Sequence, residues 1–177
     1  AVAVAHFGPT AAHPGANFGQ RLADAAAGLS SSGGLAFASN GDLLVGDGFA
    51  MAPGQTAQIV RVHNGVQSTF GVTNLGGVYA PSALMTLADD SLLIVDLVAN
   101  YVAHYDANGL PLAPFASIQP PIAPPGSNFP SDLKLDPDGN IIISVLGATN
   151  PPDNRGALWR YDLNGNILDP DNDMTPN

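Results

Sequence analysis

The stretch Pro130–Ser144 reads PSDLKLDPDGNIIIS, which combines a short strand pattern, an Asp-Gly turn and an apolar run. Two earlier stretches have the same form: PSALMTLADDSLLIV begins at Pro81, and GGLAFASNGDLLVG begins at Gly33. Three leucines hold equivalent places in these stretches at a spacing of 49 residues: Leu35, Leu84 and Leu133. Self-similarity at a fixed spacing of this size indicates a repeat architecture, in which each repeat is one structural unit.

Each repeat carries the signals of four short antiparallel strands. Its turn contains Asn-Gly, Asp-Asp or Asp-Gly, and the glycine turns supply the positive φ that a two-residue hairpin needs. The uninterrupted apolar run after the turn predicts a second strand that is buried on both faces. Third strands are predicted at 58–65, 101–109 and 157–165, and fourth segments at 66–70, 110–115 and 166–170. Four strands in about 40–50 residues are typical of a β-propeller blade.

The predicted fold is therefore all-β, a single partial propeller over residues 1–177 with about three and a half blades. Val4 precedes Val102 by 98 residues, twice the repeat, so the chain is expected to start at a third strand. The predicted segments are an outer half-blade, three blades and an acidic tail: 1–18, 33–70, 81–115, 130–168 and 169–177. Closed propellers have about 4–8 blades. We expect the natural protein to be longer, with self-association into a ring or polymer as the alternative.

The composition narrows the functional classes. All 15 acidic residues are Asp, Lys134 is the single lysine, and the net charge is −10. This charge argues against binding to nucleic acid or to an anionic membrane, because both require basic patches. The chain has no cysteine and no apolar run near the ~20 residues of a membrane-spanning helix. We expect an exported protein of bacterial type, either secreted, periplasmic or attached to the cell surface.

The repeat resembles the NHL class of β-propellers. The resemblance rests on a Pro-Ser start, an Asp-containing turn, an Asp after the second strand and a Tyr-Asp pair after the third. The 81–115 repeat carries all of these: Pro81, Ser82, Leu84, Asp89, Asp96, Asn100, Val102, Tyr105 and Asp106. In the 130–168 repeat, Val145 stands where the class has Asp. The resemblance implies a propeller but no single activity, because propellers include hydrolases, lyases and binding platforms.

Ligands of propellers bind mainly over the central channel, on the face built by the loops between blades and between second and third strands. The candidate residues for this face are Asp47, Asp96, Asn100, Asn128, Asp132 and Asn154. Each aspartate either caps its loop by accepting backbone N–H groups or supplies oxygen ligands to Ca²⁺. The run Asp169, Asp171 and Asp173 is a further candidate for Ca²⁺, with a solvated acidic linker as the alternative.

Two functions follow from these observations. The first is a non-catalytic binding or assembly module that engages a protein or surface partner, because no catalytic constellation is visible. The alternative rests on a resemblance to gluconolactonase-like propellers, which are metal-dependent hydrolases of sugar lactones. That resemblance implies a Ca²⁺-dependent site at the central channel, with Asp47, Asp96, Asn128 and Asp132 lining the metal cavity.

Overall fold

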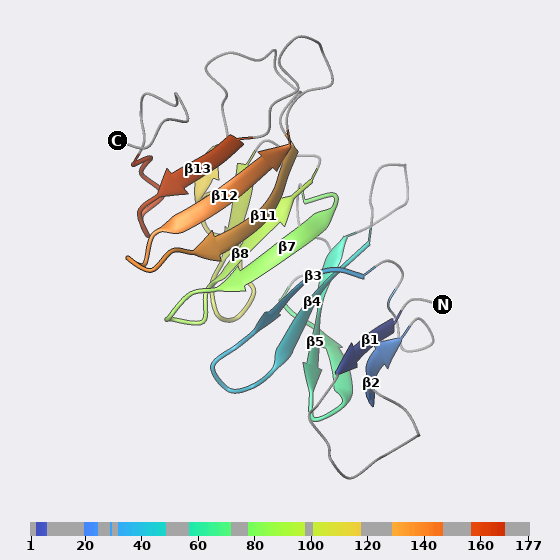
Figure 1. Cartoon of the computed structure of the whole chain (residues 1–177). Coiled ribbons are helices and arrows are strands. Elements are labelled where there is room, and N and C mark those ends of the chain that lie inside the picture. Colours follow the sequence, from blue (N-terminus) through green and yellow to red (C-terminus); the bar gives the residue numbers. More distant parts are fainter. Residues whose placement is uncertain are drawn as a thin grey trace.

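The computed structural model describes residues 3–6, 20–24, 29, 32–48, 57–71, 78–97, 101–117, 129–146 and 157–168. These residues form strands, turns and bends, and none of them is helical (Figure 1). The strands are β1(Ala3–His6), β2(Gln20–Asp24), β3(Ser32–Phe37), β4(Leu43–Asp47), β5(Gln58–His63), β6(Val66–Thr69), β7(Pro81–Thr86), β8(Leu92–Asp96), β9(Tyr101–Tyr105), β10(Ala116–Ser117), β11(Phe129–Leu135), β12(Ile141–Leu146) and β13(Ala157–Tyr161). In the described part of the chain, no helix has the length and apolarity to cross a membrane.

The strands make four antiparallel sheets. Strands β3 to β6 form blade 1, β7 to β10 form blade 2, β11 to β13 form blade 3, and β1 pairs with β2. Figure 1 shows the sheets following one another in chain order, with β3 beside β7 and β7 beside β11. The prediction of an all-β fold built from propeller blades is confirmed.

The register confirms that the 49-residue repeat is structural. The three repeated leucines face the same partner position on the second strand in each blade: Leu35↔Val45, Leu84↔Ile94 and Leu133↔Ile143. The second strands β4 and β8 are buried along their whole length, as the uninterrupted apolar runs predict. Local sequence therefore sets both the pairing and the burial of the inner strands.

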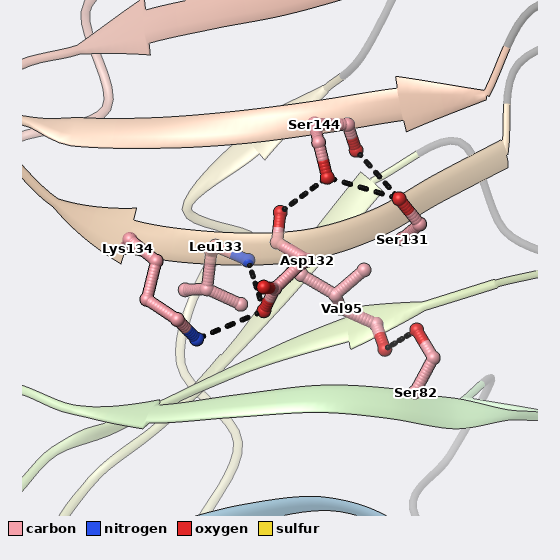
Figure 2. A network of polar contacts seen from close by, with 7 residues as sticks. All are labelled: Ser82, Val95, Ser131, Asp132, Leu133, Lys134 and Ser144. Atoms are coloured by element: carbon pink, nitrogen blue, oxygen red, sulfur yellow. Dashed lines mark hydrogen bonds and ion pairs between the residues drawn. The ribbon is translucent and has the colours of Figure 1, made fainter.

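The Pro-Ser start of blades 2 and 3 has a structural role in a bulge. In both blades the register shifts by one residue around the serine, between Pro81 and Ala83 in blade 2. Ser82 Oγ donates a hydrogen bond to the Val95 carbonyl at 3.2 Å, and Ser131 Oγ donates to the Ser144 carbonyl at 3.4 Å (Figure 2). The serine is the unpaired residue of the bulge, and its hydroxyl donates a hydrogen bond to a carbonyl of the second strand.

In blade 1 the positions of this Pro-Ser pair are Ser32 and Gly33, and a second glycine, Gly34, stands at the position of Ala83. A Cβ added at Gly33 would lie 2.2 Å from the Pro81 carbonyl oxygen, and one at Gly34 would lie 2.5 Å from the Ala83 Cα. Side chains at these positions would collide with the backbone of β7. The glycines therefore allow the first strands of blades 1 and 2 to approach closely.

The core lies between the blades. The blade 1–blade 2 cluster contains Leu44, Ala57, Ile59, Phe70, Val78, Leu84, Leu92, Ile94, Ala103 and Tyr105. The blade 2–blade 3 cluster contains Ala83, Leu93, Val95, Val102, Phe115, Ala116, Leu133, Ile141, Ile143, Val145, Trp159 and Tyr161. A smaller cluster on the other face of blade 1 contains Leu29, Leu43, Val45, Val60 and Val62. Each blade thus buries its flat faces only by packing against another layer.

The three repeated leucines differ in burial, which the sequence repeat did not predict. Leu84 packs against blade 1 and Leu133 packs against blade 2, whereas Leu35 is 50% exposed. The side chain in each case points toward the preceding blade. For blade 1, the preceding layer corresponds to the two outer strands β1 and β2, so no described inner strands cover Leu35.

The outer strands also depart from the sequence prediction. The fourth strand of blade 2 is β10, whereas 110–115 forms only a bridge from Pro111 to Tyr105. Proline has no N–H to donate to a ladder, and Pro111 and Pro114 both lie in this segment. The partner of β1 is β2, which lies beyond the 1–18 segment that was predicted as the outer half-blade.

Candidate functional site

Asp96 ends β8 and holds the loop that enters blade 2. Its Oδ2 accepts a hydrogen bond from the Tyr79 N–H at 2.5 Å, and its Oδ1 accepts one from the Ala80 N–H at 3.1 Å. The residue has 0% exposure. A buried carboxylate that accepts two backbone N–H groups satisfies donors that would otherwise lie unpaired in the core. These hydrogen bonds are those expected of a loop cap, which is one of the two roles predicted for Asp96.

Asp47 occupies the equivalent position at the end of β4 and is 1% exposed. Its Oδ2 accepts a hydrogen bond from Gln58 Nε2 at 3.1 Å, which links the second strand of blade 1 to the start of the third. In blade 3 the same position is Val145, which is buried in the apolar cluster. Blades 1 and 2 thus carry a buried carboxylate at this end of the sheet, and blade 3 replaces it with an apolar side chain.

Two tyrosines flank Asp96. Tyr79 precedes β7 and is 48% exposed, whereas Tyr101 begins β9 and is partly buried against the blade 1–blade 2 cluster. Burial raises the pKa of Tyr101 above its ordinary value, and the nearby Asp96 and Tyr79 raise it further. This end of blade 2 therefore presents one accessible aromatic ring beside a neutral, half-buried phenol.

Asp132 lies in a different environment from the other two candidates. It is in β11, where its Oδ1 accepts hydrogen bonds from the Leu133 N–H at 2.9 Å and from Lys134 Nζ at 3.1 Å (Figure 2). The side chains of Asp132 and Lys134 are 52% and 74% exposed. Asp132 is therefore part of an exposed ion pair on a strand face, whereas Asp47 and Asp96 are buried.

The described residues do not complete a cation site. Among them, no three histidine or acidic side chains come close enough together to hold a metal ion. Both oxygens of Asp96 accept hydrogen bonds from loop N–H groups. The remaining candidates lie outside the described residues: Asn100, Asn128, Asn154, Asp169, Asp171 and Asp173.

A polar cluster that the sequence analysis missed lies at the opposite end of blade 1. Asp42 is buried and its Oδ1 contacts His63 Nδ1, while its Oδ2 accepts from Asn40 Nδ2 at 3.0 Å and lies 3.8 Å from Arg61 Nε. The hydrogen bond with His63 is the main cause that holds the pKa of Asp42 below its ordinary value of 3.8, against the effect of burial.

Blade 3 has a corresponding cluster. Arg160 Nε donates to Asp136 Oδ2 at 2.7 Å, and Arg160 Nη2 donates to Asp138 Oδ2 at 2.8 Å. Burial acts to raise the pKa of Asp136, but hydrogen bonds from Asn140 and Arg160 leave it below its ordinary value. The sequence signal for both clusters is a basic residue near the end of the third strand. Such a residue recurs in each blade, close to the acidic turn between the first and second strands.

Comparison with known proteins establishes the fold. No protein-family model matches the chain, and no curated protein sequence matches it. A protein provisionally identified as a gluconolactonase superposes with a TM-score of 0.61 at 20% identity, over 88% of this chain and 53% of that one. Regucalcin from Agrobacterium tumefaciens, a calcium-binding protein, matches with a TM-score of 0.53 at 19% identity, over 77% of this chain and 43% of that one.

A third solved structure extends the comparison to another reaction. The PQQ-bound aldose sugar dehydrogenase of Streptomyces coelicolor matches with a TM-score of 0.53 at 18% identity, over 78% of this chain and 46% of that one. The chain thus spans about half the length of these three proteins. At such identities the likeness concerns the fold, and one fold can carry several chemistries.

These comparisons correct the first functional expectation. The first of these structures carries a gluconolactonase name, which fits the gluconolactonase-like alternative and not a non-catalytic binding module. The preferred expectation, a non-catalytic binding or assembly module, is therefore wrong. The comparisons do not single out the NHL class among propellers. The chain has a propeller-type fold.

Proposed function

We propose that the chain belongs to a hydrolase of gluconolactonase type, which opens a cyclic sugar ester at the central channel of the propeller. The observation that carries the proposal is the match to the provisionally identified gluconolactonase, which extends over 88% of this chain. The buried carboxylates Asp47 and Asp96 at equivalent blade ends support it, because Asp47 links β4 to the start of β5 and Asp96 holds the loop that enters blade 2.

In this proposal Asp96 is a positioning residue. Its two hydrogen bonds hold the backbone of Tyr79 and Ala80 at the entry to β7. The accessible ring of Tyr79 then has a defined place at this end of blade 2, where an aromatic face can pack against the C–H face of a sugar ring. Holding such a contact group in place reduces the entropy lost when the substrate binds.

A calcium requirement belongs to the same proposal. It is supported by the calcium-binding name of the regucalcin match and by the preference of Ca²⁺ for carboxylate and amide oxygens. Because the described residues do not complete a cation site, we assign Asp47 and Asp96 to loop positioning and derive no reaction step through a cation.

Lactone hydrolysis by the full chain tests the proposal. Opening a sugar lactone releases a carboxylic acid, so the reaction can be followed with a pH indicator in weak buffer, with Ca²⁺ or with a chelator. We expect hydrolysis above the buffer rate in Ca²⁺, a lower rate with the chelator, and a higher KM for Tyr79→Ala. Val66→Ala is the control, because Val66 is exposed on the outer strand β6. Hydrolysis no faster than in buffer under all conditions would contradict the proposal.

A further inference from the structure

The turn between β5 and β6 holds a side-chain arrangement that the proposed function does not use. Asn64 and Gly65 form this turn, and Asn64 has a φ of +48°. The ring of His63 lies between two partners: its Nδ1 contacts Asp42 Oδ1, and its Nε2 lies 3.0 Å from Asn64 Nδ2. The Asp42 side chain is 4% exposed and the His63 side chain is 58% exposed. An asparagine amide therefore lies beside an imidazole that a buried carboxylate orients.

The dipeptide Asn-Gly is prone to deamidation, because glycine has no Cβ to hinder its backbone nitrogen. In this reaction the glycine nitrogen loses its proton and bonds to the asparagine Cγ. The Cγ–Nδ2 bond breaks, Nδ2 takes up a proton, and ammonia leaves. Water then opens the succinimide ring to aspartate or isoaspartate. The net change exchanges ammonia for water, and nothing is oxidised or reduced.

The same dipeptide occurs in three other turns, which serve as internal comparisons. In these turns the asparagines are Asn40, Asn108 and Asn164. Each glycine N–H, which carries the attacking nitrogen, donates to a backbone carbonyl: Gly41 to Ala38 at 2.9 Å, Gly109 to Asp106 at 2.9 Å and Gly165 to Asp162 at 3.1 Å. These hydrogen bonds must break before the nitrogen can attack.

The three comparison turns have a second restraint. Asn40 Nδ2 donates to Asp42 Oδ2 at 3.0 Å and Asn40 Oδ1 accepts from the Asp42 N–H at 2.9 Å, so this side chain is held away from Gly41. A Cβ added at Gly109 would lie 2.5 Å from the Gly71 Cα, and one at Gly165 would lie 2.0 Å from the Phe115 carbonyl oxygen. Such close packing resists the backbone rotation that brings the nitrogen to Cγ.

The turn at Asn64 is more open. The ladder of β5 and β6 ends at the pair His63↔Val66, so the Gly65 N–H lies at the tip, beyond the paired residues. A Cβ added at Gly65 would meet no described atom within 4 Å. Strand β6 is the edge strand of its sheet, and none of its four residues is buried. Local opening of this hairpin therefore costs less than opening of the packed turns.

His63 adds a chemical advantage at this turn. A carboxylate only accepts hydrogen bonds, so the contact with Asp42 assigns a hydrogen to His63 Nδ1 and leaves Nε2 directed at the Asn64 amide. A His63 ring that has taken a proton from water at Nε2 can pass it to Asn64 Nδ2 as the Cγ–Nδ2 bond breaks. This is the role of a general acid.

We propose that Asn64 is a site of spontaneous deamidation, with His63 as the group that protonates the departing nitrogen. The product carries a new carboxylate beside His63 and Asp42, so the negative charge at this end of blade 1 increases as the protein ages. The proposal does not depend on the proposed enzymatic activity, because it uses only residues of blade 1 and water.

Peptide mapping by tandem mass spectrometry tests the proposal on the full chain after incubation in neutral buffer. The four Asn-Gly pairs are followed in the same sample. In the folded chain we expect Asn64 to be deamidated roughly tenfold faster than the other three, a ratio that corresponds to a difference of about 1.4 kcal/mol in local opening. In urea the four rates should converge, because the reacting dipeptide is the same. Equal rates in the folded chain would overturn the proposal.

His63→Gln tests the proton donor. We expect this variant to slow deamidation of Asn64 severalfold and to leave the other three sites unchanged. Arg61→Gln is the matched control, because it also removes a basic side chain near Asp42, at 3.8 Å, from the same strand. Trp159 fluorescence verifies that each variant is folded, since Trp159 is buried between blades 2 and 3.

Two results would overturn the role of His63. One is an unchanged rate at Asn64 in folded His63→Gln, and the other is an equal loss of rate in Arg61→Gln. If His63→Gln does not fold, the comparison of the four sites in the wild type still decides whether Asn64 is the deamidation site.

Discussion

Gly109→Ala tests whether close backbone contact between the outer parts of blades 1 and 2 stabilises the propeller arc. Gly109 lies in the turn after β9 with a φ of +78°, and a Cβ added there would lie 2.5 Å from the Gly71 Cα and 2.7 Å from the Gly71 nitrogen. Both neighbouring atoms are backbone atoms, so no flexible side chain can move aside. The alanine variant must separate the two blades or distort the turn.

The size of the effect follows from two separate costs. An alanine in the left-handed region costs about 1–2 kcal/mol relative to glycine. Forcing an extra carbon into a packed contact adds about 1–3 kcal/mol. Gly65 isolates the first cost, because it lies between the third and fourth strands of blade 1 with a φ of +79°, and a Cβ there meets nothing within 4 Å.

Urea unfolding followed by Trp159 fluorescence measures both variants. Trp159 is the only tryptophan and lies buried in the blade 2–blade 3 cluster. We expect Gly65→Ala to lower the free energy of unfolding by about 1–2 kcal/mol, and Gly109→Ala to lower it by about 1–3 kcal/mol more. Gly165→Ala should resemble Gly109→Ala, because its Cβ would lie 2.0 Å from the Phe115 carbonyl oxygen.

Equal losses for Gly65→Ala and Gly109→Ala would refute the reasoning. Such a result would mean that the turn conformation alone causes the loss in the free energy of unfolding, and that the blades separate without measurable cost. A change in the urea dependence of Gly109→Ala, with no change in midpoint, would instead indicate altered cooperativity.

Three further predictions concern the buried groups. Asp96→Ala should lower stability by roughly 1–3 kcal/mol, because two loop N–H groups lose their acceptor, and hydrogen exchange of the Tyr79 amide should speed up; unchanged exchange would exclude the capping role. Asp42 has a lowered pKa, so its stabilisation is present above the ordinary value of 3.8 and is lost as the pH falls through the native value. Asp42→Asn should therefore flatten the acid side of a stability–pH curve, and an unchanged slope would contradict this. Leu133→Ala should cost about 2–5 kcal/mol, whereas Leu35→Ala, at the exposed equivalent position, should cost less than about 1 kcal/mol; similar values in urea unfolding would show that repeat position matters more than burial.

Much of the fold is encoded in short stretches of the chain. The alternation of side chains, the Asn-Gly and Asp-Gly turns and the apolar second strands are local features, so each blade could be predicted from its own residues. The outer strands were harder to predict, because Pro111 and Pro114 interrupt the ladder in 110–115 and shift the fourth strand to Ala116–Ser117.

The candidate site was only partly predictable. The spacing of Asp47 and Asp96 identified two buried carboxylates at equivalent positions, and the capping alternative describes the hydrogen bonds of Asp96. The contact of Asp42 with His63 joins residues 21 positions apart, one directly before β4 and the other at the end of β5. Such pairs arise from sheet register, which the composition of either strand alone does not reveal.

The sequence by itself determined the repeat unit, the strand order within each blade and the register of its inner strands, because turns and alternation act over a few residues. The tertiary structure alone decided whether equivalent positions of the repeat are buried or exposed. Leu35 and Leu133 have the same local surroundings in sequence, yet one is half exposed and the other is buried. The physical reason is that a blade hides its faces only against a neighbouring layer, so burial depends on residues that are distant in the chain.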